Sequence, residues 1–469
     1  MATVVELRPA VQTSPAAPRR AEVAQTALRA ARLPRYTSYP TALQFDAAVG
    51  PDQAAAWMRA VPADEPVSIY VHVPFCDTLC WFCGCHTRVV NVRGPIEAYV
   101  RSLVAEIEMV AGMLGRRHRV SHLHFGGGSP TILEPGDIDL IFRTLTRAFD
   151  IGSEAEIALE IDPRDLDPAR LDAWATAGVN RASLGVQDLD PEVQKAINRI
   201  QPAEATAQAV QELRARGIHA INIDLVHGLP HQTVEGVIAT VDQVLTLAPD
   251  RVALFGYAHV PTLKPHQRLV PEHALPGAVE RLEQAEAAAR RLIAAGYAGI
   301  GLDHFARPED SLAVAQREGR LRRNFQGYTT DMATAILGFG PSAIGDLPGG
   351  YVQNTTDVRA WREAIAAGRL GTVRGVAVTA DDLLRRAVIE RLMCDHAVDV
   401  AAVAAGQGRD PAELADAFAR LAPLEARGVV VRDGWRLTVP AGMTPDVQRV
   451  ATCFDTYLNP AVWAMVAAE

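Results

Sequence analysis

The chain has 469 residues, of which 49% are hydrophobic, and it carries a formal net charge of −9. This length and apolar content exclude a disordered chain and predict two domains, or one large domain with appendages. The acidic balance argues against bulk nucleic-acid binding, no apolar run approaches the roughly 20 residues of a membrane helix, and the N-terminus lacks the apolar segment of a secretory signal. We therefore expect a cytoplasmic protein whose thiols stay reduced.

Residues 1–50 predict an N-terminal arm. Its first 34 residues are Ala-rich, with a short helix expected around Ala21–Ala31. The segment 35–40, RYTSYP, is expected to be extended, because a residue that precedes proline disfavours the helical region. It either forms a strand across the domain surface or brings Arg35 and Tyr36 to a substrate.

From Val67 onward, strand and helix patterns alternate. Strands are expected at 68–73, 120–125, 156–161, 180–186, 220–226 and 251–257, and helices at 95–114, 136–149, 167–177 and on to about 216. Strands that alternate with helices indicate βαβ units and a parallel sheet. Six units predict an α/β fold with a partial (β/α)6 barrel, in a domain spanning residues 51–378.

After about residue 263 the barrel pattern weakens. We expect a helix over Pro276–Ala295 that Pro276 starts, a strand leading into a loop over 299–310, a polar-aromatic loop over 323–330 and a Gly-rich turn over 338–345. Residues 379–469 predict a mostly helical C-terminal domain with short apolar strands at Val429–Val431 and Trp435–Thr438, similar to a winged helix. No basic recognition helix is present there, so we expect a lid or a substrate cradle.

Polar and small residues gather where the predicted strands end. A cysteine loop follows the first strand and Gly126-Gly127-Gly128 the second. The other strand ends carry Glu160, Gln187, Asp224 and Tyr257-Ala258-His259. Because barrel active sites form at the carboxyl ends of the strands, this pattern predicts an active site.

The cysteine loop carries the strongest metal-binding signal. Cys76, Cys80, Cys83 and Cys85 lie within ten residues. Soft thiolates spaced C-x3-C-x2-C favour zinc or an iron–sulfur cluster, and three ligands on a [4Fe–4S] cluster leave one iron open. Zinc stays an alternative with His86 as a ligand, although the chain has no second Cys pair. A disulfide fits poorly with a large chain that has no secretory signal.

This spacing resembles the hallmark of the radical S-adenosylmethionine (SAM) superfamily. The further Cys85 makes the loop similar to that of oxygen-independent coproporphyrinogen III oxidases (dehydrogenases), a family of anaerobic haem biosynthesis. The segments HFGGGSPT, SLGVQD, NIDLVHGLP, DHFARP and RNFQGYTT extend the resemblance from about Arg35 to the C-terminal FDTYL.

The resemblance implies a radical-SAM oxidoreductase that decarboxylates two propionates of coproporphyrinogen III to vinyl groups, giving protoporphyrinogen IX. It implies a [4Fe–4S] cluster held by Cys76, Cys80 and Cys83 and open to SAM at its fourth iron, and two SAM molecules. The first SAM would contact Tyr70, Gly127, Glu160 and Ile344. The second would contact Phe82, Gly128, Ser129 (often Thr in the family), Gln187, Arg199, Asp224 and Ala258.

Tyr70 and Cys85 are the predicted catalytic residues. For Cys85, three roles stay open: a hydrogen donor, a group supporting the cluster without ligating it, and a packed thiol. Cys394 and Cys453 are expected to be core thiols. Nearly every positive charge is Arg, since Lys195 and Lys264 are the only lysines. Candidate clamps for the anionic substrate are Arg35, Arg88, Arg307, Arg322 and Arg323.

The expected partners are the tetrapyrrole substrate and an electron donor such as a flavodoxin-like protein. We expect no nucleic acid, no membrane span and a monomer. Two rival functions remain: a haem chaperone of the same superfamily that binds haem without this turnover, and a structural zinc protein.

Overall fold

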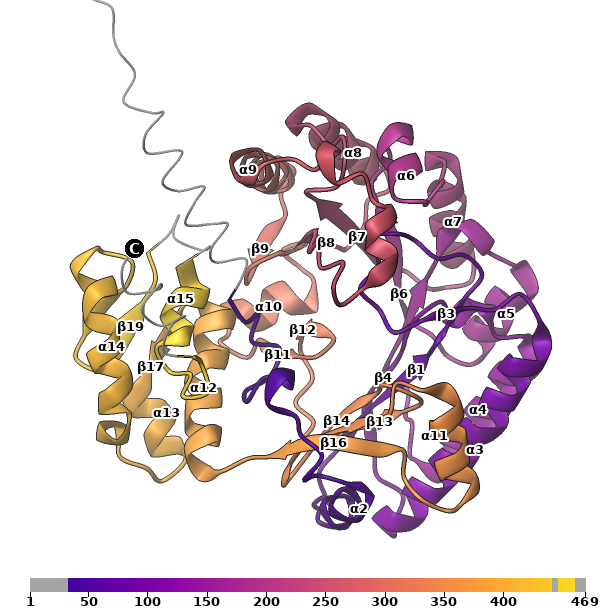
Figure 1. Cartoon of the computed structure of the whole chain (residues 1–469), viewed down its shortest axis with the longest axis horizontal. Helices are drawn as coiled ribbons and strands as arrows, with labels where there is room; N and C mark the ends of the chain where they lie inside the picture. Colours follow the sequence, from indigo (N-terminus) through magenta and orange to yellow (C-terminus); the bar gives the residue numbers. More distant parts are fainter. Residues whose placement is uncertain (1–32, 441–445, 460–469) are drawn as a thin grey trace, which may run out of the picture.

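The computed structural model describes residues 33–440 and 446–459 and is built on a twelve-stranded sheet (Figure 1). Six neighbouring parallel strands form its centre: β1 (Val67–Val73), β4 (Val120–Gly127), β5 (Glu156–Ile161), β6 (Arg181–Gln187), β7 (Ala220–His227) and β8 (Arg251–Gly256). They match the six predicted strands and confirm the partial (β/α) barrel.

Helices follow these strands and cover the outer face of the sheet (Figure 1). They are α3 (Arg93–Leu114), α4 (Pro135–Ala148), α5 (Pro168–Thr176), α6 (Pro191–Ala196), α7 (Ala203–Ala215), α8 (Val234–Thr246) and α9 (Ala278–Ala294). Their apolar stripes pack on the strands, and the Phe125 ring on β4 meets Trp174 on α5 with centroids 4.9 Å apart. Because α9 begins at Ala278, with Gly277 as its N-cap, the expected start at Pro276 is wrong.

A seventh parallel strand, β13 (Ala335–Phe339), pairs with the free side of β1. It continues into three antiparallel strands, β14 (Ile344–Leu347), β15 (Gly350–Asn354) and β16 (Thr372–Ala377), with α11 (Val358–Ala366) between the last two. The expected Gly-rich turn over 338–345 is therefore wrong in extent, because strands enter it from both sides. Its glycines let the two strands lie close: a Cβ on Gly338 would come 2.7 Å from the Ile344 carbonyl oxygen.

The other edge of the sheet is closed by β10 (His304–Ala306), which is antiparallel to β8, and by β9 (Ala298–Ile300), which is antiparallel to β10. The expected single strand and loop over 299–310 is thus two short strands, followed by α10 (Ser311–Arg317). The expected loop over 323–330 is a hairpin of β11 (Arg322–Asn324) and β12 (Gly327–Thr329). Aromatic and β-branched residues in it favour strand pairing, which the polar composition obscured.

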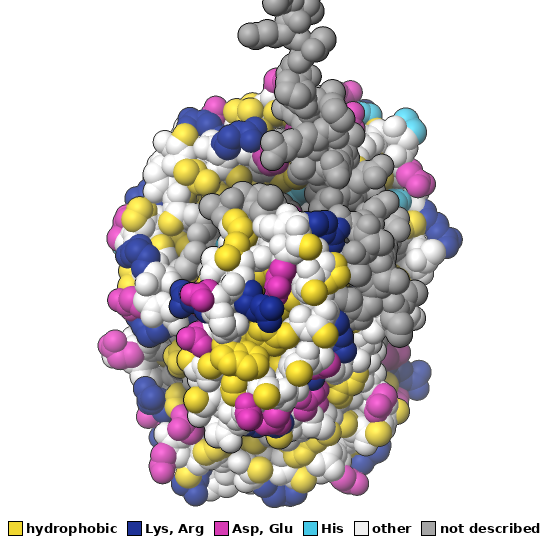
Figure 2. Space-filling view, turned by 90° about the vertical axis from the view of Figure 1, so that its left-hand side faces the viewer, with side chains coloured by type: hydrophobic (Ala, Val, Ile, Leu, Met, Phe, Trp, Pro, Cys, Tyr) yellow, Lys and Arg dark blue, Asp and Glu magenta, His cyan; other side chains and the backbone are white. Residues whose placement is uncertain are grey.

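The C-terminal unit has its own apolar core, around Leu384, Leu392, Leu421 and Phe454. Its elements are α12 (Ala380–Asp395), β17 (Ala397–Asp399), α13 (Val400–Gly406), α14 (Ala415–Ala426), β18 (Val431–Asp433), β19 (Arg436–Thr438) and α15 (Val447–Thr452). The sheet order β17-β19-β18 agrees with the winged-helix-like prediction. Basic and acidic side chains intermix on the described part of the face in Figure 2. The predicted boundaries at residues 50 and 378 stay predictions.

The described part of the N-terminal arm fastens to this unit. Tyr36 and Tyr39 are buried in its core, and the Tyr36 hydroxyl donates to Asp455 Oδ2 at 3.0 Å. The expectation of a surface strand is therefore wrong, and the Tyr36 side chain does not face a substrate site. Farther on, Asp46 bridges to Gly375 on β16, while the helix expected at Ala21–Ala31 lies outside the described residues. The chain has, within its described ranges, no helix long and apolar enough to cross a bilayer.

Candidate active site at the barrel mouth

The cysteine loop leaves the carboxyl end of β1 and is fixed to α6. The Trp81 amide donates to the Ile197 carbonyl oxygen at 2.9 Å, and Asn198 Nδ2 donates to the Leu79 carbonyl oxygen at 2.9 Å. Cys80 is buried between these contacts, whereas Cys85 is exposed. The short strands β2 (Phe75–Cys76) and β3 (Arg88–Val89) pair in parallel at the two ends of the loop.

A second segment fastens the loop from the β8 side. Three side chains at the 3-10 helix Pro265–Leu269 donate to loop carbonyls: Gln267 to Phe82 at 2.9 Å, His266 to Cys83 at 2.8 Å and Lys264 to Cys85 at 3.2 Å. The sequence analysis did not predict these contacts. The one usable indication was that Lys264 is one of only two lysines in the chain. Gln267 also donates to the Ala258 carbonyl oxygen at 3.2 Å, so Phe82 and Ala258 lie on either side of it.

The donor set of the loop consists of soft cysteine sulfurs. No three Cys, His, Asp or Glu side chains converge on one metal position in residues 33–440 and 446–459. Thiolates on zinc all lie about 2.3 Å from one ion. Burial raises the pKa of Cys76 to about 12, and the electrostatic effect of Cys83 and Cys80 raises it further. The three thiols are therefore close enough to interact. The three sulfurs match the ligand type of an iron–sulfur cluster.

Each cysteine sulfur has its own polar neighbours. Thr87 donates to Cys76 Sγ at 3.0 Å, and the Cys85 amide donates to Cys83 Sγ at 3.3 Å. A hydrogen bond from the Cys85 thiol lowers the pKa of Cys83 to about 6, with help from His266. The same bond is the main cause that raises the pKa of Cys85.

Two arginines reach the third sulfur. Arg199 Nη1 lies 3.3 Å and Arg164 Nη2 lies 3.4 Å from Cys80 Sγ. Both guanidinium groups also bond Asp162, at 3.1 Å and 2.6 Å, and they lower its pKa against the opposing effect of burial. Asp162 and Arg164 follow β5 directly; the sequence analysis missed them, although their strand-end position was a usable signal.

The triple glycine lets the turn after β4 lie against the cysteine loop. The amides of Gly128 and Ser129 donate to the carbonyls of Val73 and Phe75, both at 2.7 Å. A Cβ on Gly128 would come 2.3 Å from the Phe75 carbonyl oxygen, and Gly127 has φ of 112° with no room beside His72. Only glycine fits here, which explains the motif.

Glu160 and Tyr70 belong to one polar network at the mouth. Glu160 accepts from the Gly127 amide and from His124 Nε2, both at 3.0 Å. Burial raises the pKa of Glu160, but the bonds from His124 and Gly127 outweigh it and hold the pKa low. His72 Nε2 lies 2.8 Å from the His86 carbonyl oxygen and must donate to it, so its Nδ1 accepts from the Tyr70 hydroxyl at 3.1 Å.

The other predicted residues lie at the same end of the sheet. Asp224 accepts from Ser183 at 3.0 Å and from Asn222 at 2.8 Å, and burial, with the charge of Glu160, raises its pKa to about 6. Gln187 ends β6 with φ of 69°. Ile344 begins β14 against Gly338, the register partner of Tyr70 on β1.

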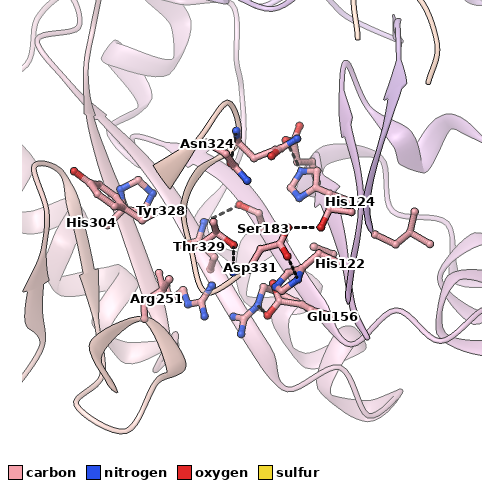
Figure 3. Close-up of a pocket in the computed structure, with 18 of the residues that line it drawn as sticks. His122, His124, Glu156, Ser183, Arg251, His304, Asn324, Tyr328, Thr329 and Asp331 are labelled. Atoms are coloured by element: carbon pink, nitrogen blue, oxygen red, sulfur yellow. Dashed lines mark hydrogen bonds and ion pairs between the residues drawn. The ribbon is translucent and has the colours of Figure 1, made fainter. Parts of the chain in front are cut away.

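A polar cavity of about 240 Å³ extends from Glu160 and Asp224 into the barrel (Figure 3). Ion pairs line its floor, at the amino ends of the strands: His122–Asp331 at 3.2 Å and Arg181–Glu156 at 2.9 Å. Arg251 also lines the floor and pairs with Asp310, behind the lining, at 2.9 Å. His304 and Tyr328 lie on one side, with ring centroids 5.2 Å apart. His304 is thus part of the cavity wall.

The candidate substrate clamps are largely engaged within the protein. Arg35 pairs with Asp303, and Arg322 pairs with Glu390 at 2.8 Å. Arg323 is buried over the Tyr328 ring, at 4.3 Å from its centroid. Arg307 donates to the Pro249 carbonyl oxygen at 3.0 Å, and Arg88 faces Asp357 at 4.0 Å. These five residues do not form one clamp. Cys394 and Cys453 are buried, as expected.

A parallel barrel with a three-cysteine loop at its mouth defines the radical SAM class of proteins. The model of the radical SAM superfamily matches residues 70–244, and the model of the HemN C-terminal domain matches residues 378–442.

Named relatives narrow the class. The chain is 51% identical to an oxygen-independent coproporphyrinogen III oxidase of Bradyrhizobium diazoefficiens, over 92% of this chain and 95% of that protein. It is 41% identical to that of Salmonella typhimurium, over 91% and 93%. The solved coproporphyrinogen III oxidase (HemN) of Escherichia coli, a radical SAM enzyme, matches with a TM-score of 0.86 and 39% identity, over 90% and 97%.

The chain belongs to the family of oxygen-independent coproporphyrinogen III oxidases, which are radical SAM oxidoreductases. The resemblance and the fold class predicted from the sequence are confirmed. Membership implies an iron–sulfur cluster of the [4Fe–4S] type and SAM.

Proposed function

We propose that this chain converts coproporphyrinogen III to protoporphyrinogen IX by oxidative decarboxylation of two propionates to vinyl groups. The observation that carries the proposal is the meeting of the thiol loop, the triple glycine and Glu160 at one barrel mouth, above a polar cavity. The names of relatives that cover more than nine-tenths of the chain support the same reaction.

We assign cluster ligation to Cys76, Cys80 and Cys83 and place two SAM molecules at the mouth. When bound, the cluster supplies the electron that splits SAM into methionine and a 5′-deoxyadenosyl radical. Tyr70, Gly127, Glu160 and Ile344 hold the first SAM in this assignment. The second is held by Phe82, Gly128, Ser129, Gln187, Arg199, Asp224 and Ala258.

The chemistry of these side chains fits the assignment. Glu160, kept ionised by His124, accepts from ribose hydroxyl or ammonium groups. Arg199, whose terminal nitrogens bond Asp162 and Cys80, contributes positive charge towards a methionyl carboxylate. The close-lying glycines let backbone groups approach a ligand. Tyr70, on β1 at the mouth, is a catalytic residue in this assignment, and its hydroxyl is held by a hydrogen bond to His72. Cys85 is exposed beside Cys83 and serves as a hydrogen donor in this assignment.

The proposal also covers the electron donor, the cellular location, the oligomeric state and the domains of the protein. A one-electron donor such as a flavodoxin-like protein reduces the enzyme, which acts as a cytoplasmic monomer without nucleic acid. The arm of residues 1–50 and the domain of residues 379–469 flank a catalytic domain of residues 51–378, and the C-terminal domain serves as a lid or cradle.

Anaerobic turnover tests the function. Protein reconstituted with iron and sulfide is incubated with SAM, reductant and coproporphyrinogen III, and divinyl product is quantified by chromatography. We expect product from the wild type and none from Cys80→Ser. Tight haem binding with no product would instead revive the haem-chaperone alternative, which the names of the relatives do not favour.

A further inference from the structure

Cys80 differs from the other two proposed ligands in the charge beside its sulfur. Arg164 and Arg199 each place a guanidinium nitrogen within 3.4 Å of Cys80 Sγ. Cys76 Sγ accepts from the neutral Thr87 hydroxyl. Cys83 Sγ accepts from the amide and thiol of Cys85, and His266 and Lys264 act on it through their charge alone. The asymmetry is built into the fold, because Arg164 follows β5 and Arg199 follows α6.

Asp162 holds this pair of arginines in place. Arg164 Nε lies 2.9 Å from Asp162 Oδ1, its Nη2 lies 2.6 Å from Oδ2, and its amide donates to Oδ1 at 3.1 Å. Arg199 bonds the same carboxylate at 3.1 and 3.2 Å and also donates to the Gly185 carbonyl oxygen. The side chains of Arg164 and Arg199 are only 13% and 7% exposed, so water screens their charge weakly.

Hydrogen bonds and positive charge at a cluster sulfur favour the reduced form. Reduction adds one electron to a cluster that already carries thiolate charge, and the potential depends on net charge, sulfur hydrogen bonds and solvent exposure. Two guanidinium groups and one carboxylate leave one net positive charge beside Cys80. Charge-assisted hydrogen bonds are about twice as strong as neutral ones.

We propose that Arg164, fixed by Asp162, is a positioning residue that raises the reduction potential of the cluster through its hydrogen bond to Cys80 Sγ. This inference rests on the proposed ligation by Cys76, Cys80 and Cys83. Arg199 touches the same sulfur but is also assigned to SAM, so Arg164 isolates the effect on the cluster.

The test is an anaerobic redox titration of reconstituted full-length protein, with the reduced cluster quantified by electron paramagnetic resonance and normalised to iron content. Arg164→Gln removes the charge. At the midpoint potential of the wild type, its ratio of reduced to oxidised cluster should fall about tenfold, which is a shift of about 59 mV to more negative potential for a one-electron couple. Arg164→Lys keeps the charge but loses the fork and should shift less.

Two further variants test the direction of the potential shift and whether the shift is specific to charges beside Cys80. Asp162→Asn removes the negative charge but keeps an amide oxygen that still accepts from Arg164, so its potential should move in the positive direction. Arg170→Gln is the matched control: Arg170 lies on the neighbouring α5 and pairs with Glu134 at 2.7 Å, with Thr131 as its other described partner. It should leave the potential unchanged.

A potential of Arg164→Gln equal to that of the wild type, or one matched by Arg170→Gln, overturns the inference. If Arg164→Gln assembles no cluster, the reduction potential of Asp162→Asn tests the inference in its place. A potential that is unchanged or more negative than that of the wild type then counts against it. A wild type that loads no iron–sulfur cluster contradicts the proposed function itself. A loaded wild type with unchanged variant potentials contradicts only the role of Arg164.

Discussion

Acidic side chains at the two ends of the barrel have different partners, although the same strands carry them. At the floor, Glu156 on β5 pairs with Arg181 at 2.9 Å. At the mouth, Glu160 on the same strand has no Arg or Lys partner in the described ranges; it accepts from His124 and the Gly127 amide. Ion pairs compensate the charges at the floor within the protein, whereas the charge of Glu160 at the mouth is left for a ligand. This contrast separates fold stability from chemistry within a single cavity.

The largest effect is expected at the mouth. Cys80→Ser should abolish both cluster assembly and turnover, because serine lacks the soft sulfur ligand, while the barrel stays folded. Iron and sulfide analysis with the turnover assay measures this. Cys394→Ala, which changes a buried thiol of the C-terminal core, is the control and should keep its iron. Full activity of Cys80→Ser would contradict the assignment of the chemistry to the mouth.

At the floor, Asp331→Asn should cost stability. The Asp331 side chain is 5% exposed and holds His122, Ser121 at 2.9 Å and the Ala333 amide at 3.0 Å. Removing one partner of a buried ion pair costs about 3 kcal/mol or more. Urea denaturation under anaerobic conditions measures the loss, with Glu309→Gln, from an exposed pair, as the nearly silent control. Activity per folded molecule should persist; its loss would show that the floor takes part in chemistry.

The two acids of β5 give a matched pair of variants. Glu160→Gln should raise the SAM concentration needed for half-maximal turnover about tenfold, since one charge-assisted hydrogen bond contributes about 1.5 kcal/mol. Its iron content should match the wild type. Glu156→Gln, four residues earlier, should destabilise the fold and leave the SAM requirement unchanged. Equal SAM requirements in the two variants would contradict the assignment of Glu160.

The smallest effect is a pH dependence of the floor. Burial pulls the pKa of His122 down, but the bond and charge of Asp331 outweigh it and hold the pKa above 6.5. This contribution to stability is complete below pH 6.5 and disappears as pH rises through the raised pKa. Asp331 has a pKa of about 2 instead of 3.8, so its contribution is complete above pH 3.8 and disappears as pH falls towards 2.

The urea midpoint should therefore fall above pH 6.5 more steeply in the wild type than in His122→Gln. Denaturation series at several pH values measure this difference. Parallel pH profiles for the two proteins would remove the His122–Asp331 pair from the account of floor stability.

Sequence patterns predicted the parallel strands well because each carries buried aliphatic or aromatic residues and helical segments separate the strands. They failed for β13, a short apolar segment that pairs with the distant β1. They also failed for the hairpin of β11 and β12, whose glycine and polar residues are typical of loops. The strand-end rule located Glu160 and Asp224. It missed Arg164 and Gln267, because their contacts with the cysteine loop join residues far apart in the chain.

The most direct test of the account uses coproporphyrinogen III that carries deuterium at the propionate β-carbons. The proposed reaction predicts one deuterium transferred to 5′-deoxyadenosine for each vinyl group formed, in reconstituted wild-type protein under anaerobic conditions. Vinyl product accompanied by unlabelled 5′-deoxyadenosine, or labelled substrate recovered intact while SAM is consumed, would contradict it.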